Sequence, residues 1–167
     1  MTRKRNLRAG IPYLFVRDEG GGQTIDGSFL TWDTVVTKTT NFIYPEDANK
    51  VRMRINTAGY YEVTFNISLS GNGNAYFDIY VNGVAQTGSR VYCGPVTSGQ
   101  DYWYDSCSLK FTVFLQNEDY VQIKGTMLTG TGETIANTSR LSIKYVPMHG
   151  WDNEKGGVKR RIGGIED

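Results

Sequence analysis

The stretch YEVTFNISL at residues 61–69 decides the fold class. Every second residue from Tyr61 to Leu69 is apolar, and the residues between them are polar. Because successive side chains of a β-strand point to opposite faces of a sheet, this alternation predicts a strand with one face in a core. The other face is predicted to meet water or a partner.

The same alternation recurs along the chain. Residues 75–81 repeat it and end at Asn82-Gly83, a pair suited to the positive φ angles of a tight hairpin turn. Further copies lie at residues 51–55, 109–115, 121–123 and 141–145, with weaker candidates at 31–37 and 41–44. No window has a helical period. The pattern therefore predicts an all-β protein, an antiparallel jelly-roll sandwich of about eight to ten strands.

Three stretches break the alternation and suggest the domain organisation. We expect a basic N-terminal arm at 1–22, a jelly-roll domain at 23–148 and a charged C-terminal tail at 149–167. A long excursion rich in Gly, Ser and aromatic residues spans 84–106. The two arms are either loosely held termini or segments that become ordered on a neighbouring subunit.

The net charge of +1 is unevenly distributed. Residues 1–10 hold four bases and no acid, and residues 11–150 hold ten bases against thirteen acids. The body is therefore slightly acidic, and no direct nucleic-acid role is expected. The apolar run at 11–16 is too short for a secretory signal, and the sequence has no transmembrane stretch, so we expect no membrane insertion and synthesis in a host cytoplasm.

Four motifs occur in an order that is characteristic of one group of proteins. Residues 59–63 read GYYEV, 78–83 read DIYVNG, 117–123 read NEDYVQI and 141–143 read LSI. In this order they resemble the strands and turns of the complement globular-head and tumour-necrosis-factor superfamily of trimeric jelly rolls. The sequence departs from that pattern in three of the motifs: Val63 stands where Phe is usual, Glu118 replaces a turn Gly, and the last motif lacks its aromatic and Gly. An unrelated jelly roll of viral capsid type is the alternative.

The resemblance implies a homotrimer packed around a threefold axis, with loops at one end facing partners. Tyr60, Tyr76 and Tyr80 fall in the polar phase of strands whose other phase fills the core. Aromatic residues on an outer face suit a subunit interface, which is where we expect these three. The alternative is that they form cross-strand pairs on a solvated sheet.

The sequence offers few parts for catalysis. His149 is the only histidine, so triads and multi-histidine metal sites lack their components. Adjacent acids such as Asp18-Glu19 sit in predicted turns, where carboxylates usually serve solubility and turn formation. We expect no enzymatic activity, no catalytic or metal-binding residues and no cofactor.

The most suggestive cluster is aromatic and acidic: Asp101, Tyr102, Trp103, Tyr104 and Asp105. Such residues in a loop suit stacking on sugar rings or gripping a protein partner. Alternatively, members such as Trp103 close the end of the sandwich. The two cysteines of the chain, at 93 and 107, flank this region as either a disulfide or free, partly buried thiols.

These features together suggest a structural virion surface protein of a bacteriophage or related virus: a capsid decoration, cement or head-fibre trimer. In this hypothesis the arms contact other capsid proteins through Arg3, Lys4, Arg5, Arg8, Lys159, Arg160 and Arg161. The alternative is a receptor- or glycan-binding module, such as a tail-fibre tip or a bacterial complement-like lectin. A carbohydrate-active enzyme is a third possibility.

Overall fold

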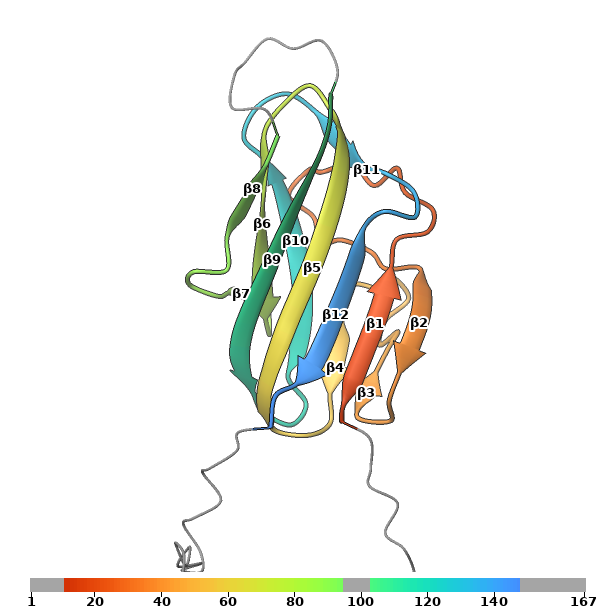
Figure 1. The fold of residues 1–167 in the computed structure, drawn as a ribbon, viewed down its shortest axis with the longest axis vertical. Helices are drawn as coiled ribbons and strands as arrows, with labels where there is room; N and C mark the ends of the chain where they lie inside the picture. Colours follow the sequence, from red (N-terminus) through yellow and green to blue (C-terminus); the bar gives the residue numbers. More distant parts are fainter. Residues whose placement is uncertain (1–10, 95–102, 148–167) are drawn as a thin grey trace, which may run out of the picture.

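The computed structural model describes residues 11–94 and 103–147, with side chains from residue 105 onward in the second range. Within these residues the chain forms twelve strands and no helix, and the strands make two antiparallel sheets (Figure 1). Sheet A has the order β9 (Trp103–Leu115), β5 (Gly59–Gly71), β12 (Arg140–Tyr145), β1 (Tyr13–Arg17) and β2 (Thr34–Lys38), and β11 (Gly132–Thr134) also pairs with β5. Sheet B has the order β3 (Phe42–Ile43), β4 (Met53–Ile55), β10 (Tyr120–Met127) and β6 (Ala75–Val81), with β7 (Val84–Ala85) and β8 (Val91–Cys93) on the far side of β6.

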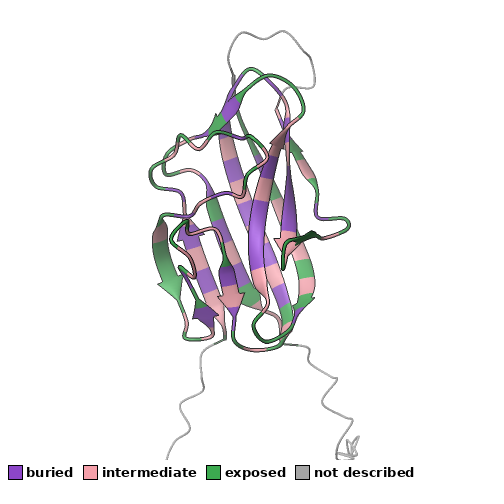
Figure 2. Cartoon of the chain, turned by 180° about the vertical axis from the view of Figure 1, so that it is seen from behind, coloured by how far each residue is buried: buried purple, intermediate pink, exposed green. Residues whose placement is uncertain are grey.

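Strand β5 confirms the alternation from which the fold class was predicted. Tyr61, Val63, Phe65, Ile67 and Leu69 are all 0% exposed, and the residues between them are half-buried. The same banding of buried and half-buried residues runs along other strands in Figure 2. Apolar side chains from both sheets meet in one core, which confirms the all-β sandwich.

The predicted hairpin turn at Asn82-Gly83 is also confirmed. Val81 of β6 pairs with Val84 of β7, so the turn contains only these two residues. Their φ angles are 51° and 78°, in the left-handed region that such a turn needs.

Residue 118, where the family pattern places Gly, also has left-handed backbone geometry. Glu118 lies in the turn between β9 and β10 with a φ of 73°, a conformation that disfavours residues other than Gly. Its backbone N–H donates to the carbonyl of Ile55 at 2.8 Å, and its carboxylate pairs with Arg54 at 2.9 Å. These contacts hold Glu118 in a left-handed backbone conformation that a glycine at this position would adopt without strain.

Two boundaries from the sequence need correction. Residues 13–17 were assigned to the N-terminal arm, but they form β1 inside sheet A, between β12 and β2. Leu14 and Val16 belong to the core. The alternation in YLFVR therefore indicates a strand, although Pro12 and the basic residues before it favoured an arm. The excursion at 84–106 also contains β7, β8 and the start of β9.

The sandwich has two distinct ends. At one end, which we call the terminal pole, the N–H of Tyr145 donates to the carbonyl of Pro12 at 2.9 Å, so both ends of the described domain lie together. At the other end, the loop pole, β8 ends and β9 begins, with Trp103 paired to Gly71 (Figure 1). The thirteen-residue strand β5 connects the poles, which puts them roughly 40 Å apart along the strand.

Candidate interaction surfaces

The outer face of sheet A carries an aromatic patch at the terminal pole. Tyr60 on β5 pairs with Phe114 on β9, with ring centroids 5.1 Å apart in an edge-to-face arrangement. These residues are 39% and 47% exposed, and Ile11 beside β1 is also exposed. We define the aromatic patch as Tyr60 and Phe114, because Lys144 of β12 and Glu62 of β5 lie between these rings and Tyr13 on β1.

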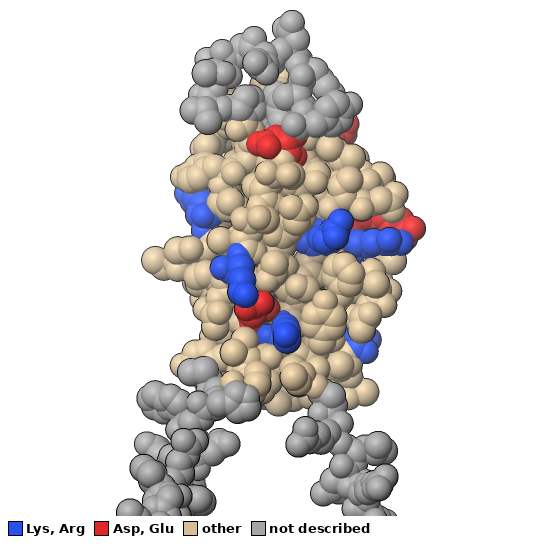
Figure 3. All heavy atoms as spheres, in the orientation of Figure 1, with Lys and Arg blue, Asp and Glu red and all other residues tan. Residues whose placement is uncertain are grey.

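The centre of this face is polar. Moving away from the patch, the outward positions of the neighbouring strands carry Ser142 on β12, Thr64 and Asn66 on β5, and Ser108 on β9. Figure 3, which views the molecule from this side, also shows charged side chains on this face, and Lys110 of β9 pairs with Glu62 of β5 at 2.7 Å. A hollow of about 430 Å³ lies next to the patch and is lined by Ile11, Tyr13, Glu62, Ser142 and Lys144.

On the outer face of sheet B, positively charged side chains lie over the aromatic rings. The guanidinium of Arg90 lies 3.9 Å from the ring centre of Tyr76 and makes two hydrogen bonds to Asp78, at 2.9 and 2.8 Å. Lys124 lies 5.7 Å from the ring of Tyr80, which packs edge-to-face on Phe29.

A third cation covers a ring near β4, where the guanidinium of Arg52 lies 4.8 Å from the ring centre of Tyr120. Tyr92 on β8 projects further, at 62% exposed, and its ring packs against Tyr76. This face is therefore a layer of stacked rings and cations that largely covers itself.

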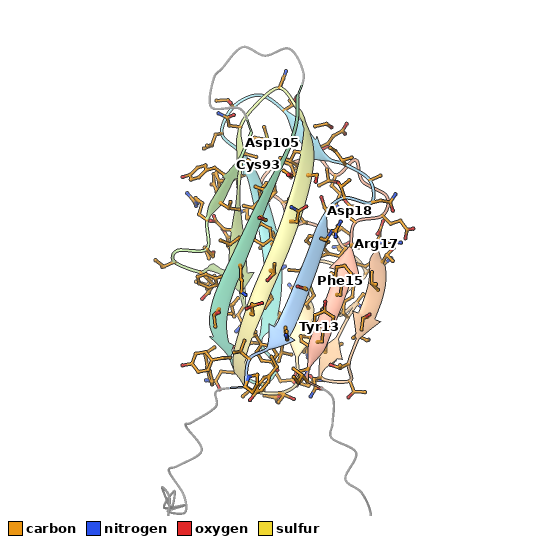
Figure 4. The ribbon with its side chains drawn as sticks, viewed as in Figure 1. Tyr13, Phe15, Arg17, Asp18, Cys93 and Asp105 are labelled. Carbon is orange, nitrogen blue, oxygen red and sulfur yellow. The ribbon has the colours of Figure 1, made fainter. Side chains whose placement is uncertain are left out.

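At the loop pole, Asp105 joins the ends of β8 and β9. Its Oδ2 accepts a hydrogen bond from the N–H of Gly94 at 2.8 Å and lies 4.0 Å from the Sγ of Cys93 (Figure 4). Cys93 and Cys107 are both buried free thiols. The interaction with the Cys107 thiol, followed by burial and the charge of Asp105, raises the pKa of the Cys93 thiol.

The acidic residues near β1 are used to fix turns. Asp18 is buried and accepts hydrogen bonds from Thr134 Oγ1 at 2.5 Å and from the N–H of Gly21 at 2.8 Å. Asp33 accepts from the N–H groups of Glu19 and Gly20, and although burial opposes them, these bonds lower its pKa. Where the structure is described, no cluster of three or more His, Cys, Asp or Glu side chains could hold a metal ion.

No family model matches the sequence, and no curated protein matches it. Among solved structures, the chain is similar to the Eiger tumour necrosis factor (TNF) of S. frugiperda, with a TM-score of 0.64. The match covers 82% of this chain and 93% of the other, at 9% sequence identity. The fold is a TNF-like jelly roll. The resemblance seen in the motif order is thus confirmed at the level of the fold.

The TNF-like sandwich separates the three tyrosines predicted for a subunit interface. Tyr60 belongs to the aromatic patch on sheet A, whereas Tyr76 and Tyr80 lie on the outer face of sheet B. The alternation shows which residues leave the core, but it cannot assign their strands to a sheet. It also left Phe114, Tyr13 and Phe15 unremarked, although all three alternate with core residues.

Most of the predicted partner-binding residues lie at or beyond the limits of the described chain. Asp101 and Tyr102 fall outside the described residues, and Trp103 and Tyr104 are the first residues of β9. Asp105 is described and serves as the tether between β8 and β9. The arm and tail residues Arg3, Lys4, Arg5, Arg8, Lys159, Arg160 and Arg161 also lie outside. Within the described ranges, the TNF-like domain contains no helix that could cross a membrane.

Proposed function

We propose that this protein is a homotrimeric, non-enzymatic component of a virion surface, whose arms bind the viral shell while its loop pole faces outward. The observation that carries the proposal is that the two ends of the sandwich differ. The first and last described residues lie at the terminal pole, and the end of β8 and the start of β9 lie at the opposite pole. One end can therefore hold a support while the other reaches a partner.

The proposed trimer uses the outer face of sheet A. The exposed rings of Tyr60 and Phe114 offer apolar area, and the neighbouring charges of Glu62 and Lys110 pair with each other, which suits a subunit interface. Strand β9 is an edge of this sheet, and its inward residues Leu109, Phe111 and Val113 are only partly buried. A threefold ring joins two different surfaces at each contact, and the sheet A face and the β9 edge supply two such surfaces.

The attachment to the shell is assigned to the N-terminal arm. Residues 1–10 carry a charge of +4, whereas residues 11–150 carry ten bases against thirteen acids. A basic arm on a slightly acidic body favours an acidic capsid surface and directs that contact to one pole. The tail residues Lys159, Arg160 and Arg161 are proposed to contact neighbouring capsid subunits.

The proposal is tested with the full chain and a variant lacking residues 2–10. Light scattering coupled to size-exclusion chromatography should give the mass of three chains for both proteins. Co-sedimentation with capsids of the encoding virus should be retained by the full chain and lost by the truncated one. A single-chain mass would overturn the trimer, and undiminished co-sedimentation of the truncated chain would overturn the role of the arm.

A glycan- or receptor-binding role is the second proposal, favoured by the position of Trp103 and Asp105 at the loop pole. This pole lies away from Pro12 and Tyr145, and the aromatic and acidic sequence around residue 103 begins there. A glycan array should then show saturable binding by the full chain and none by Trp103→Ala. Binding that is equal in the two proteins would remove this role from Trp103.

A further inference from the structure

The two cysteines lie on different sheets but at the same place in the sandwich. Cys93 ends β8 at the edge of sheet B and pairs with Ala75, and Cys107 lies on β9 at the edge of sheet A and pairs with Ile67. Strands β8 and β9 pack side by side although they belong to different sheets. Both side chains are buried in the same core cluster, at 2% and 8% exposure.

Asp105 holds this arrangement together. It precedes Cys107 by two residues on β9, and its carboxylate accepts the N–H of Gly94, the residue after Cys93. The same carboxylate lies 4.0 Å from the Sγ of Cys93. The end of β8 is therefore fastened to β9 beside Cys107.

The surroundings of the two thiols also favour a reaction between them. Interaction with Cys107, burial and the negative charge of Asp105 raise the pKa of Cys93, so a reagent from solution is met first by Cys107, the more exposed of the two thiols. The thiol partner that Cys93 meets within the fold is Cys107.

We propose that Cys93 and Cys107 form a redox pair that a low-molecular-weight disulfide, such as oxidised glutathione, converts into a disulfide across the two sheet edges. The thiolate of one cysteine attacks the glutathione disulfide and releases one reduced glutathione. The thiolate of the second cysteine then displaces the second glutathione from the mixed disulfide. Two protein thiols lose two protons and two electrons, and one glutathione disulfide becomes two glutathione thiols.

The bond would have a mechanical consequence at the loop pole. It closes a loop over residues 94–106 and ties the free edge of sheet A to the free edge of sheet B. Closing a loop of this length restricts the unfolded chain, and we expect the melting temperature to rise by about 5–10 °C. On the proposed function, the surface turned toward partners is then firm outside a reducing cytoplasm and less constrained within it.

The experiment uses the full chain, incubated with oxidised glutathione, alkylated and measured by intact mass spectrometry. The expected product has lost two hydrogens, takes up no alkylating reagent and returns to the starting mass with reductant. Peptide mapping should join residue 93 to residue 107 within one chain. The variants Cys93→Ser and Cys107→Ser are matched controls, which should end as glutathione adducts or remain open to alkylation.

Two results would overturn the proposal. One is a folded chain that keeps two alkylatable thiols under conditions that oxidise the denatured chain. The other is a disulfide between chains, seen as a dimer on a denaturing gel without reductant. Both results are read on separated chains, so they are independent of whether the protein is a trimer or binds a capsid.

Discussion

The outer faces of the two sheets both carry aromatic residues, yet they hold them in different ways. On sheet B, Arg90 covers Tyr76 and Lys124 lies over Tyr80. On sheet A, Tyr60 and Phe114 pack against each other, and among the described residues no cation covers them. An aromatic ring that already has a cation above it gains less from a partner than one that faces water. For the proposed trimer, the comparison favours sheet A as the face of subunit contact and sheet B as a surface that packs on itself.

The strongest way to break this comparison is to place a charge on each face. We expect Phe114→Glu to convert the proposed trimer into single chains, because a carboxylate buried in an apolar contact costs several kcal/mol. Tyr92→Glu is the matched control, since Tyr92 is also an exposed aromatic on an edge strand but belongs to sheet B. Light scattering measures both masses. Dissociation by Tyr92→Glu alone would reverse the assignment of the faces.

A smaller effect, on stability, should follow from removing the contact that holds Arg90 over Tyr76 on sheet B. Asp78 is 5% exposed and accepts both hydrogen bonds from Arg90, so Asp78→Ala removes the group that holds this cation over Tyr76. We expect the free energy of unfolding to fall by about 1–3 kcal/mol, measured by urea denaturation, while the mass of the assembly stays the same. Unchanged stability would show that the layer does not hold itself together.

The smallest expected effect concerns the cation at the end of that layer. Arg52 lies over Tyr120 and also approaches Asp47 at 3.7 Å, and both contacts are solvent-exposed. Arg52→Ala should cost about 0.5–1 kcal/mol in the same urea titration, with partial recovery in Arg52→Lys, which keeps the charge. A larger loss would mean that this edge of sheet B is buried in the assembly.

The predictable part of the structure was the part determined by local alternation. The strand at 61–69 and the turn at Asn82-Gly83 were predicted because period two and positive φ are properties of neighbouring residues. The pairing of strands into two sheets depends on contacts far apart in sequence, so the separation of Tyr60 from Tyr76 could not be seen in advance.

The position of a strand at the edge of a sheet could not be predicted either, and it affects how deeply its apolar residues are buried. Leu109, Phe111 and Val113 alternate as regularly as the residues of β5, but they are only partly buried because β9 has a neighbour on one side only. Strand β1 was missed for a different reason. Its YLFVR alternation covers five residues next to a basic segment and a proline, too short a signal to outweigh its surroundings.

The first and last residues of the described domain lie at the same pole, which has a consequence for binding strength. In the proposed trimer, three copies of residues 1–10 would start from one side of the assembly and bring twelve positive charges to it, four from each copy. Once one arm is bound, the other two bind as intramolecular events at high effective concentration. Individually weak arms would then give slow release from a repeating surface, and a lone chain would detach readily from the same surface.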